Sequence, residues 1–462
     1  MLESQISPTP GDASWFAHDR FGLFVHWGLY SLAARHEWVQ SIEAVHDKAY
    51  AKKYFEHFDP DLYNPEVWAD AAADAGMKYF VVTTKHHEGF CLWDSKHTRF
   101  NARHTPYGKD VLRPMVEAFN ARGLKTGFYH SLKDWAHPDY FVDYFSHPRR
   151  NELPPIAIKP DSQLVPPDGS GYTGQDVNAQ RVQARYAEFM KNQVRELLTE
   201  FGPVAALWFD FSFVKYADQA RDNFAFNKGR EAWQSEALYA MIRELQPQVL
   251  MNDRLDLDLP LSGGDFKTPE QAQPWRWVHH EGQPVVWEAC QTFSGSWGYA
   301  RDEYDWRSVK QLITTLIDCV SKGGNLLLNV GPNGRGEIDA RALDRLAGIG
   351  RWMRLHDRSI YGCTQAPEAF TCPQDCRLTY NPDKKRMYLH LFNWPYKFVH
   401  LFGKAWTEQV EYAQLLNDAS ECQGLDDWHA RFLNLPDDTL SLRLPQREPE
   451  GVEVPVIELF LK

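Results

Sequence analysis

The side chains most able to do chemistry in this sequence follow short apolar runs. Asp210 is the clearest case, because the other seven residues of 204–211 are all apolar. Gly202 and Pro203 mark a turn before this run, which is therefore typical of a fully buried strand. A carboxylate at the end of such a strand is costly unless it is paired or used. Asp210 is thus either a satisfied structural residue or a catalytic acid at the mouth of a parallel barrel.

Other apolar runs also end in polar side chains. Six predicted strands end in residues that can transfer a proton or bind a polar ligand: His26, His86 with His87, Tyr129, Asp210, Arg254 and Glu288. In a parallel barrel all strands end at one face, and that face carries the active site. Taken together, the six strand ends favour a functional role for Asp210 over a structural one.

Several common catalytic chemistries do not fit these residues. His86 and His87 are neighbours, and neighbours on a strand point to opposite faces, so they do not converge on one metal ion. The sequence has no His-x-His, His-Glu-x-x-His or Gly-x-Ser-x-Gly motif. Gly323 and Gly324 precede a strand instead of opening a helix, which argues against a phosphate site. Neither a metal nor another cofactor is therefore expected.

What remains is a pocket rich in acids, histidines and aromatic rings, which suits glycoside hydrolysis. That reaction needs one carboxylate as nucleophile or base and a second carboxyl group as proton donor. His, Arg and Tyr can hydrogen-bond sugar hydroxyls, and aromatic rings can pack on the apolar face of a sugar. The 17 Trp agree with this interpretation, although Trp is also a good core residue.

Apolar runs and helical patterns alternate from residue 21 to residue 356. Strands are predicted at 21–27, 79–84, 125–129, 204–211, 249–254, 284–288 and 323–329, and helices at 65–76, 110–122, 176–201, 231–246, 306–320 and 340–356. The strands are continuous apolar runs, which indicates a parallel sheet buried on both faces. The predicted fold class is α/β, with a (β/α)8-like TIM barrel as catalytic domain. A doubly wound open sheet is the alternative, but no glycine-rich nucleotide loop follows the first strand.

A second pattern begins near residue 360. Short alternating or β-rich runs, separated by turns, predict a C-terminal antiparallel β-sandwich domain. The domains are expected to span residues 1–360 and 361–462, with the boundary within 357–365.

Two segments have open roles. The long irregular stretch at 131–178 is rich in Pro, Asp and Gly, and it could be a lid over the site or a contact between subunits. The aromatic-rich segment 392–406, which begins near Trp394, could serve a neighbouring subunit's site. A homo-oligomer is therefore a hypothesis, with local packing of these rings as the simpler alternative.

Bulk properties exclude several classes of partner. The formal net charge of −12 and the pI near 5.8 provide no basic surface for nucleic acid. No run of 18 apolar residues occurs, so no membrane span is expected. The start of the chain lacks a basic stretch followed by an apolar core, and the seven Cys are scattered. A reducing, cytoplasmic location is expected.

Several sequence blocks, taken in order, resemble the α-L-fucosidases of glycoside hydrolase family 29. They are FGLFVHWGLYS at 21–31, EW at 37–38, TTKHHEGFCLWDS at 83–95, GFYHS at 127–131, LWFD at 207–210, NDR at 252–254, GDFKTPEQ at 264–271, WE at 287–288, SWGY at 296–299 and SKGGNLLLNVGP at 321–332. The third and last blocks are long and specific. The sandwich resembles the family only in position and type.

The resemblance implies retaining hydrolysis of terminal α-L-fucosyl residues on oligosaccharides or glycoconjugates, through a covalent fucosyl-enzyme intermediate. It places the nucleophile at Asp210, in agreement with the strand-end argument. It also implies a set of fucose contacts: His26, Glu37, Trp38, His86, His87, Tyr129, Arg254 and, near the methyl group of the sugar, Trp297.

The acid/base catalyst has four candidates: Asp265, Glu270, Glu281 and Glu288. The resemblance favours Glu270, the Glu of a Thr-Pro-Glu motif on a predicted loop. Glu288 is the alternative, because it stands on a strand, where it could instead pair with Arg254 or a histidine. In a retaining enzyme the two carboxyl groups should lie about 5–5.5 Å apart.

Two other functions stay open at this point. One is a non-catalytic sugar-binding protein on a decayed enzyme scaffold, but decay tends to remove the carboxylates, and Asp210, Glu270 and Glu288 are all present. The other is a glycosidase of different specificity, since only the resemblance singles out fucose.

Overall fold

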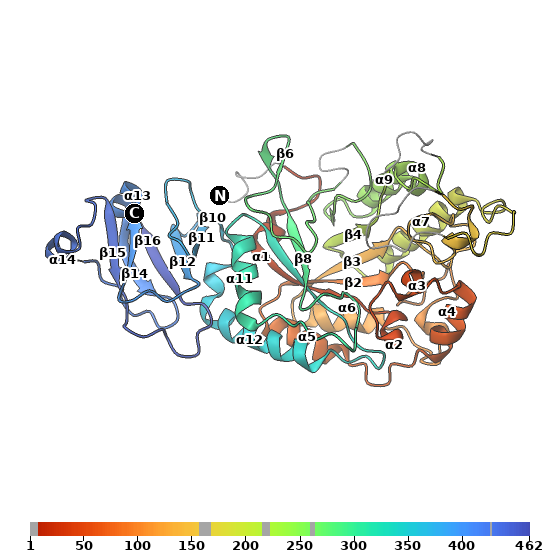
Figure 1. Cartoon of the computed structure of the whole chain (residues 1–462), viewed down its shortest axis with the longest axis horizontal. Coiled ribbons are helices and arrows are strands. Elements are labelled where there is room, and N and C mark those ends of the chain that lie inside the picture. The colour runs from red at the N-terminus through yellow and green to blue at the C-terminus, as the bar shows by residue number, and fades with distance from the viewer. Residues whose placement is uncertain (1–7, 157–167, 215–221, 259–263, 426) are drawn as a thin grey trace.

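The computed structural model describes residues 8–156, 168–214, 222–258, 264–425 and 427–462. A parallel sheet and its helices occupy the centre and right of Figure 1, and the antiparallel strands lie at the left. Helices α11 (Val309–Val320) and α12 (Ala340–His356) lie between the two. Trp352 on α12 donates its Nε1–H to the carbonyl oxygen of Val454 at 2.8 Å, which ties the two parts together.

The parallel sheet contains seven strands in the order β5-β4-β3-β2-β1-β9-β8. Their bounds are β1 Phe21–Val25, β2 Tyr79–Lys85, β3 Lys125–Ser131, β4 Ala206–Asp210, β5 Leu250–Met251, β8 Glu288–Thr292 and β9 Asn325–Val330. Nearly every residue in them is buried, as expected for a sheet covered on both faces.

An eighth segment closes the sheet into a barrel between β5 and β8. Single parallel bridges join Asn252 to Phe266, Lys267 to Trp287 and Glu270 to Cys290. A side chain at Gly264 would lie 2.3 Å from the carbonyl oxygen of Asn252, so glycine permits this close approach. The segment 264–270, expected to be a loop, therefore takes the place of a strand, and the (β/α)8-like prediction is confirmed.

The prediction of a strand at 284–288 was wrong in its bounds. Strand β8 begins at Glu288, where the predicted strand ends. The apolar residues before it are buried at 3% exposure or less, but they lead into the barrel from the short hairpin β6 (His279–His280) and β7 (Gln283–Pro284). Glu288 consequently lies at the start of its strand, at the end of the barrel opposite Asp210.

Helices alternate with the strands of the sheet, and several begin at clear capping residues. Asn64 caps α5 with Pro65 in its first turn, and Ser308 and Gln311 form a capping box on α11. The predicted helix at 231–246 is divided at Gln234, whose φ is 52°. Besides α11 and α12, the α-helices of this part have these bounds: α1 Ser14–Asp19, α2 Tyr30–Ala33, α3 Val39–Ile42, α4 Asp47–Tyr54, α5 Pro65–Asp74, α6 Leu112–Ala121, α7 Gln183–Glu200, α8 Arg230–Trp233 and α9 Ser235–Leu245.

The C-terminal part is antiparallel, as predicted. A five-stranded sheet has the order β10-β11-β12-β16-β14, and β13 pairs with β15 beside it. The bounds are β10 Thr364–Gln365, β11 Cys376–Asn381, β12 Arg386–Leu391, β13 Phe398–Phe402, β14 Val410–Leu415, β15 Thr439–Arg443 and β16 Val456–Leu461, with helices α13 Lys404–Gln409 and α14 Asp427–Phe432. These strands enclose their own apolar core, separate from that of the barrel.

The aromatic segment 392–406 is mostly packed locally. Trp406 is fully buried, and Trp394 donates its Nε1–H to the carbonyl oxygen of Pro445 at 3.2 Å. Tyr396 remains 70% exposed. Service to a neighbouring subunit, and hence a homo-oligomer, stays a prediction.

Of the segment 131–178, residues 157–167 lie outside the described residues. The rest packs at the barrel mouth, where Phe145 and Leu153 form an apolar cluster with Phe213. Beside it, buried Asp143 lies 3.5 Å from the ammonium group of Lys228. Burial raises the pKa of Asp143, but Lys228 and other nearby cations outweigh this effect and lower that pKa to about 2. This part of the segment thus packs closely at the barrel mouth, and its role as a lid or as a contact between subunits stays a prediction.

No helix among the described residues is long and apolar enough to cross a bilayer. All seven cysteines are free thiols, and Cys372 alone is exposed. The cytoplasmic location stays a prediction.

Candidate active site

The carboxyl ends of the barrel strands open into a cavity of about 1030 Å³. All ten residues predicted for the site line this one cavity: His26, Glu37, Trp38, His86, His87, Tyr129, Asp210, Arg254, Glu270 and Trp297. Their convergence follows from the alternation of side chains along strands, because Ala206, Trp208 and Asp210 on β4 all point into the barrel.

Asp210 is held by a donor on each of its two oxygens. Oδ1 accepts from Arg254 Nη1 at 2.6 Å, and Oδ2 accepts from the hydroxyl of Tyr129 at 2.9 Å. The side chain is 13% exposed, so one face remains open to the cavity. The next residue, Phe211, has φ of 70°, which turns the chain away directly after the carboxylate.

Arg254 connects Asp210 to Glu270. Its Nη2 donates to Glu270 Oε2 at 3.0 Å, while Nε donates to Thr268 Oγ1 at 3.1 Å. The guanidinium group also lies 4.4 Å over the ring of Trp208, which fixes its plane. One rigid cation therefore sets the positions of both carboxyl groups.

The two carboxyl groups have different surroundings. Glu270 is 44% exposed at the cavity mouth. Partial burial raises the pKa of Glu270, and the negative charge of Asp210 raises it further, against the lowering effect of Arg254. The raised pKa favours the protonated form of Glu270, whereas Asp210 accepts hydrogen bonds from two donors.

Three histidine rings line the cavity, and each has a buried partner behind it. Nδ1 of His26 is 2.6 Å from Asn329 Oδ1, and Nδ1 of His87 is 2.6 Å from Ser131 Oγ. Nδ1 of His86 is 3.5 Å from Glu88 Oε2. Burial and the nearness of His86 lower the pKa of His26 and of His87 well below the usual value, so both rings are neutral.

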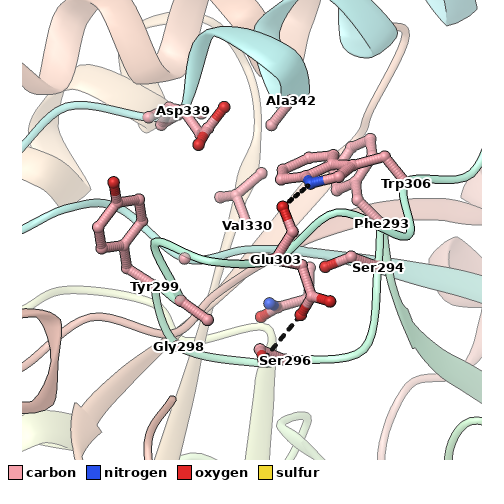
Figure 2. A pocket seen from close by; sticks show the side chains of 14 residues that line it. Phe293, Ser294, Ser296, Gly298, Tyr299, Glu303, Trp306, Val330, Asp339 and Ala342 are labelled. Atoms are coloured by element: carbon pink, nitrogen blue, oxygen red, sulfur yellow. Dashed lines mark hydrogen bonds between the residues drawn. The ribbon is translucent and has the colours of Figure 1, made fainter. Parts of the chain in front are cut away.

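The loop that carries Trp297 is tied to the other sugar-side residues. Asn329 Nδ2 donates to the carbonyl oxygen of Trp297 at 2.7 Å, and Glu37 Oε2 accepts from the amide of Gly298 at 2.9 Å. A small cavity lies behind this loop, where the Ser296 hydroxyl donates to Glu303 Oε2 at 2.9 Å (Figure 2). The loop is therefore held at three consecutive residues, Ser296, Trp297 and Gly298.

Of the four acid/base candidates, only Glu270 lines the cavity. Glu288 was expected at the mouth, and this was wrong. It is 1% exposed inside the barrel, it accepts a hydrogen bond from the Tyr79 hydroxyl, and burial raises its pKa to about 8. Asp265 accepts hydrogen bonds from Arg243 Nη2 and from two backbone amides, each at 2.7 Å. Glu281 lies on the exposed turn between β6 and β7.

Sequence reasoning missed several residues of the site. Phe211 and Lys133 form part of the wall, with the Lys133 ammonium group 3.2 Å from the centre of the Phe211 ring. Ser131 and Asn329 orient histidines. Ser131 and Asn329 lie within the GFYHS and SKGGNLLLNVGP blocks, and Phe211 follows Asp210 directly, but only the fold shows what each of them contacts. In the described part of the chain, no three His, Cys, Asp or Glu side chains are arranged to hold a metal ion.

Known proteins are similar to this chain in both sequence and fold. A family model described as alpha-L-fucosidase matches residues 6–358. The structure of alpha-L-fucosidase isoenzyme 1 from Paenibacillus thiaminolyticus superposes with a TM-score of 0.84 at 40% identity, covering 97% of this chain and 98% of that chain. Plasma alpha-L-fucosidase of Homo sapiens is 28% identical over 404 residues, which is 83% of this chain and 76% of the relative.

A further structure similar to this chain is a GH29 alpha-L-fucosidase from Bacteroides thetaiotaomicron. It is a mutant trapped as a covalent intermediate in complex with 2-fluoro-fucosyl fluoride. It superposes with a TM-score of 0.78 at 26% identity and covers 100% of this chain and 99% of that chain.

Proposed function

The chain belongs to the α-L-fucosidase family of glycoside hydrolases, and we propose that it is a retaining exo-α-L-fucosidase. Its substrates would be oligosaccharides or glycoconjugates that end in an α-L-fucosyl residue. The observation that carries the proposal is the arrangement of Asp210 and Glu270 on the two terminal nitrogens of one arginine, inside a single cavity. Such a pair supplies the two carboxyl groups that double displacement needs.

In the first step Asp210 is the nucleophile. An oxygen of its carboxylate attacks the anomeric carbon, and the bond from that carbon to the leaving oxygen breaks. Glu270 gives its proton to the leaving oxygen, so the leaving group departs as a neutral alcohol. Arg254 and Tyr129 orient the attacking carboxylate through bonds of 2.6 and 2.9 Å.

In the second step Glu270 works in the opposite direction. It takes a proton from water while the water oxygen attacks the anomeric carbon, which releases fucose and restores the Asp210 carboxylate. The change of role has an electrostatic cause. The charge on Asp210 raises the pKa of Glu270, and that charge is absent while Asp210 is esterified. The pKa of Glu270 therefore falls when a base is required.

The surrounding residues suit a deoxysugar. Neutral His26 and His87 can form hydrogen bonds with sugar hydroxyl groups, and Glu37 adds an acceptor. Trp297 and Trp38 supply apolar faces for the ring and its methyl group. The covalent intermediate trapped in the Bacteroides thetaiotaomicron relative supports the same double displacement here.

The test is release of a chromophore from an aryl α-L-fucoside by the wild type and by Asp210→Ala. We expect turnover by the wild type, its loss in the folded variant, and recovery with azide as a β-configured fucosyl azide. A variant that keeps more than about a tenth of the activity would contradict the nucleophile assignment. A folded wild type that binds fucose in a calorimeter but hydrolyses no fucoside would instead be a sugar-binding protein.

A further inference from the structure

The three cavity histidines differ in the chemistry of their buried partners. Asn329 donates its amide hydrogen to the carbonyl oxygen of Trp297, so its Oδ1 must face Nδ1 of His26. Nδ1 of His26 therefore carries hydrogen, and its Nε2 can only accept a hydrogen bond. Nδ1 of His87 faces the neutral hydroxyl of Ser131, and its Nε2 lies 3.7 Å from Asp210 Oδ2. Nδ1 of His86 faces the carboxyl group of Glu88, the one of the three Nδ1 partners that can carry charge.

Glu88 is a buried acid that the catalytic steps leave unused. It is 2% exposed, and neither oxygen has a hydrogen-bond partner among the described residues. The nearest ring nitrogen is His86 Nδ1, at 3.5 Å, which has no other partner in that part of the chain. An unpaired buried carboxylate is costly unless a nearby group compensates its charge.

The backbone is shaped to place Glu88 behind His86. The amide of Gly89 donates to the carbonyl oxygen of His86 at 3.0 Å, which closes a turn. Gly89 has φ of 86°, and a Cβ there would lie 2.2 Å from Asp134 Oδ1. A Cβ on Gly28 would lie 2.8 Å from Glu88 Oε1. The carboxyl group thus occupies space that one glycine leaves open, on a turn that another glycine permits.

Phenols, imidazoles and charged groups surround the pair. The charged groups are the ion pair of Lys85 with Asp134 and the carboxylate of Asp210, whose Oδ2 lies 3.7 Å from Nε2 of His87. Tyr30 and Tyr50 face Glu88, and burial, followed by the charge of Glu88, raises the pKa of both phenols well above the usual value. The rings of His26, His87, Tyr30 and Tyr129 surround His86 at centroid distances of 5.7, 4.1, 5.3 and 5.6 Å. The nearby ammonium group of Lys85 is 3.2 Å from Asp134. His86 is therefore the group placed to balance the charge of Glu88.

We propose that Glu88 is a positioning residue that holds a second proton on His86, so that His86 is the cationic hydrogen-bond donor of the cavity. Nδ1–H faces the carboxylate and Nε2–H faces the sugar. A charged donor binds a sugar oxygen about twice as strongly as a neutral one. His26 and His86 then present different groups to the ligand: His26 accepts a hydrogen bond, and His86 donates one from a charged ring. The role in sugar binding rests on the proposed fucosidase activity, whereas the proton on His86 does not.

The kinetic test is Glu88→Gln, which keeps the size of the side chain and removes its charge. We expect kcat/KM for an aryl α-L-fucoside to fall about tenfold, mainly through KM, because one charge-assisted bond is lost. The alkaline limb of the kcat/KM profile should move to lower pH, since His86 loses its proton more easily. Tm should stay the same or rise, because a buried charge has been removed. An unchanged kcat/KM with an unchanged pH profile would overturn the proposal.

A matched control is Glu196→Gln on α7. Glu196 is also buried, but it accepts from Trp93 Nε1 at 2.8 Å and from the amide of Lys96 at 2.9 Å, far from the cavity lining. This variant should lower Tm and leave kcat/KM and its pH profile unchanged. A fall in kcat/KM that matches that of Glu88→Gln would mean that both effects are general consequences of losing a buried acid.

A spectroscopic readout separates the proton on His86 from catalysis. In protein labelled with ¹⁵N-histidine, one ring, assigned by its loss in His86→Gln, should show both nitrogens protonated at the pH of greatest activity. The same ring should become neutral in Glu88→Gln. A neutral His86 in the wild type would refute the ion pair, even if the enzyme is active. A protonated ring in a wild type that hydrolyses no fucoside would refute the proposed function alone.

Discussion

The two ends of the barrel interior hold the same kind of side chain in opposite electrostatic conditions. At the mouth, Asp210 and Glu270 share the guanidinium group of Arg254, with donor–acceptor distances of 2.6 and 3.0 Å. At the other end, Glu288 is bound by the hydroxyl of Tyr79. Among the described residues, no cationic side chain lies within ion-pair distance of Glu288.

This difference shows what turns a barrel carboxyl group into a catalytic one. Both ends are lined by strands of the same sheet, but Glu270 is 44% exposed at the mouth whereas Glu288 is 1% exposed. A fixed cation at the mouth binds both Asp210 and Glu270, and burial together with the charge of Asp210 raises the pKa of Glu270. Without a cation, burial raises the pKa of Glu288 to about 8, so the group is a neutral hydrogen-bonding acid near pH 7. The fixed cation and the lesser burial at the mouth together separate the reactive carboxylates from a structural acid.

The contrast between the two ends of the barrel requires Glu270, and not Glu288, to be the proton donor. Glu270→Gln should reduce kcat/KM for a fucosyl disaccharide by about 10³-fold, because its alkoxide leaving group needs a proton. An aryl fucoside with an acidic phenol leaving group should lose far less. Both rates are measured on the same preparations, with Glu288→Gln as the variant from the other end of the barrel. Equal losses on the two substrates would contradict the role of Glu270 as acid.

Glu288→Gln tests the interior end through stability. The folded pKa of about 8 lies above the unfolded value of about 4.3, so the folded state binds the extra proton between these pH values. The stability that this proton provides is complete below about pH 4 and is lost as the pH rises to about 8. The variant should therefore be more stable than the wild type by about 5 kcal/mol at pH 9 and should match it near pH 4.

The measurement is denaturant unfolding of both proteins across this range, since the difference between them removes the titration of all other groups. The activity at pH 6 should be unchanged, because Glu288 does not line the cavity. Parallel stability curves for the two proteins would mean that Glu288 is already charged in the folded state.

Arg254→Lys sharpens the role of the cation at the mouth. Lysine keeps the charge but cannot bind two carboxyl groups with two fixed nitrogens, so kcat/KM should fall about 100-fold, mainly in kcat. The control is Arg243→Lys, which changes a partner of the structural Asp265 and should leave the kinetics intact. Activity near that of the wild type in Arg254→Lys would show that charge alone, without geometry, organises the pair.

The same contrast explains which parts of the site could be read from the sequence. The position of Asp210 could be predicted, because an apolar run with a turn before it indicates both the strand and its end. Glu288 was misplaced, because the apolar residues that precede it are buried without forming the strand. The segment 264–270 lacks the apolar pattern of a strand, and single bridges alone join it to its neighbours. The strand-like position of Glu270 could therefore not be predicted. The fold class followed from the alternation of elements, which is a property of many residues together.

Contacts between distant residues were beyond the reach of any local pattern. Arg254 was placed at a strand end by its sequence, but its bonds to Asp210 and Glu270 depend on barrel closure. Glu88 is adjacent to the histidine pair in sequence, yet its place behind His86 depends on the space left by Gly28. Tertiary packing decides such pairs, and their residue types alone do not.

The smallest effect is expected for the neutral donor on Asp210. Tyr129→Phe removes the hydroxyl that donates to Oδ2 at 2.9 Å and leaves the bond from Arg254 in place. Burial and the charge of Asp210 raise the pKa of Tyr129 well above the usual value, so the phenol remains a donor throughout the working range. The loss of one hydrogen bond to a charged group is worth about 1.5 kcal/mol, or about tenfold in kcat/KM. Since the phenol stays neutral, the pH profile of the variant should keep its shape, measured against Tyr79→Phe as the matched change beside Glu288. A loss as large as that of Arg254→Lys would mean that a neutral donor serves as well as the cation, and the distinction between the two ends of the barrel would fail.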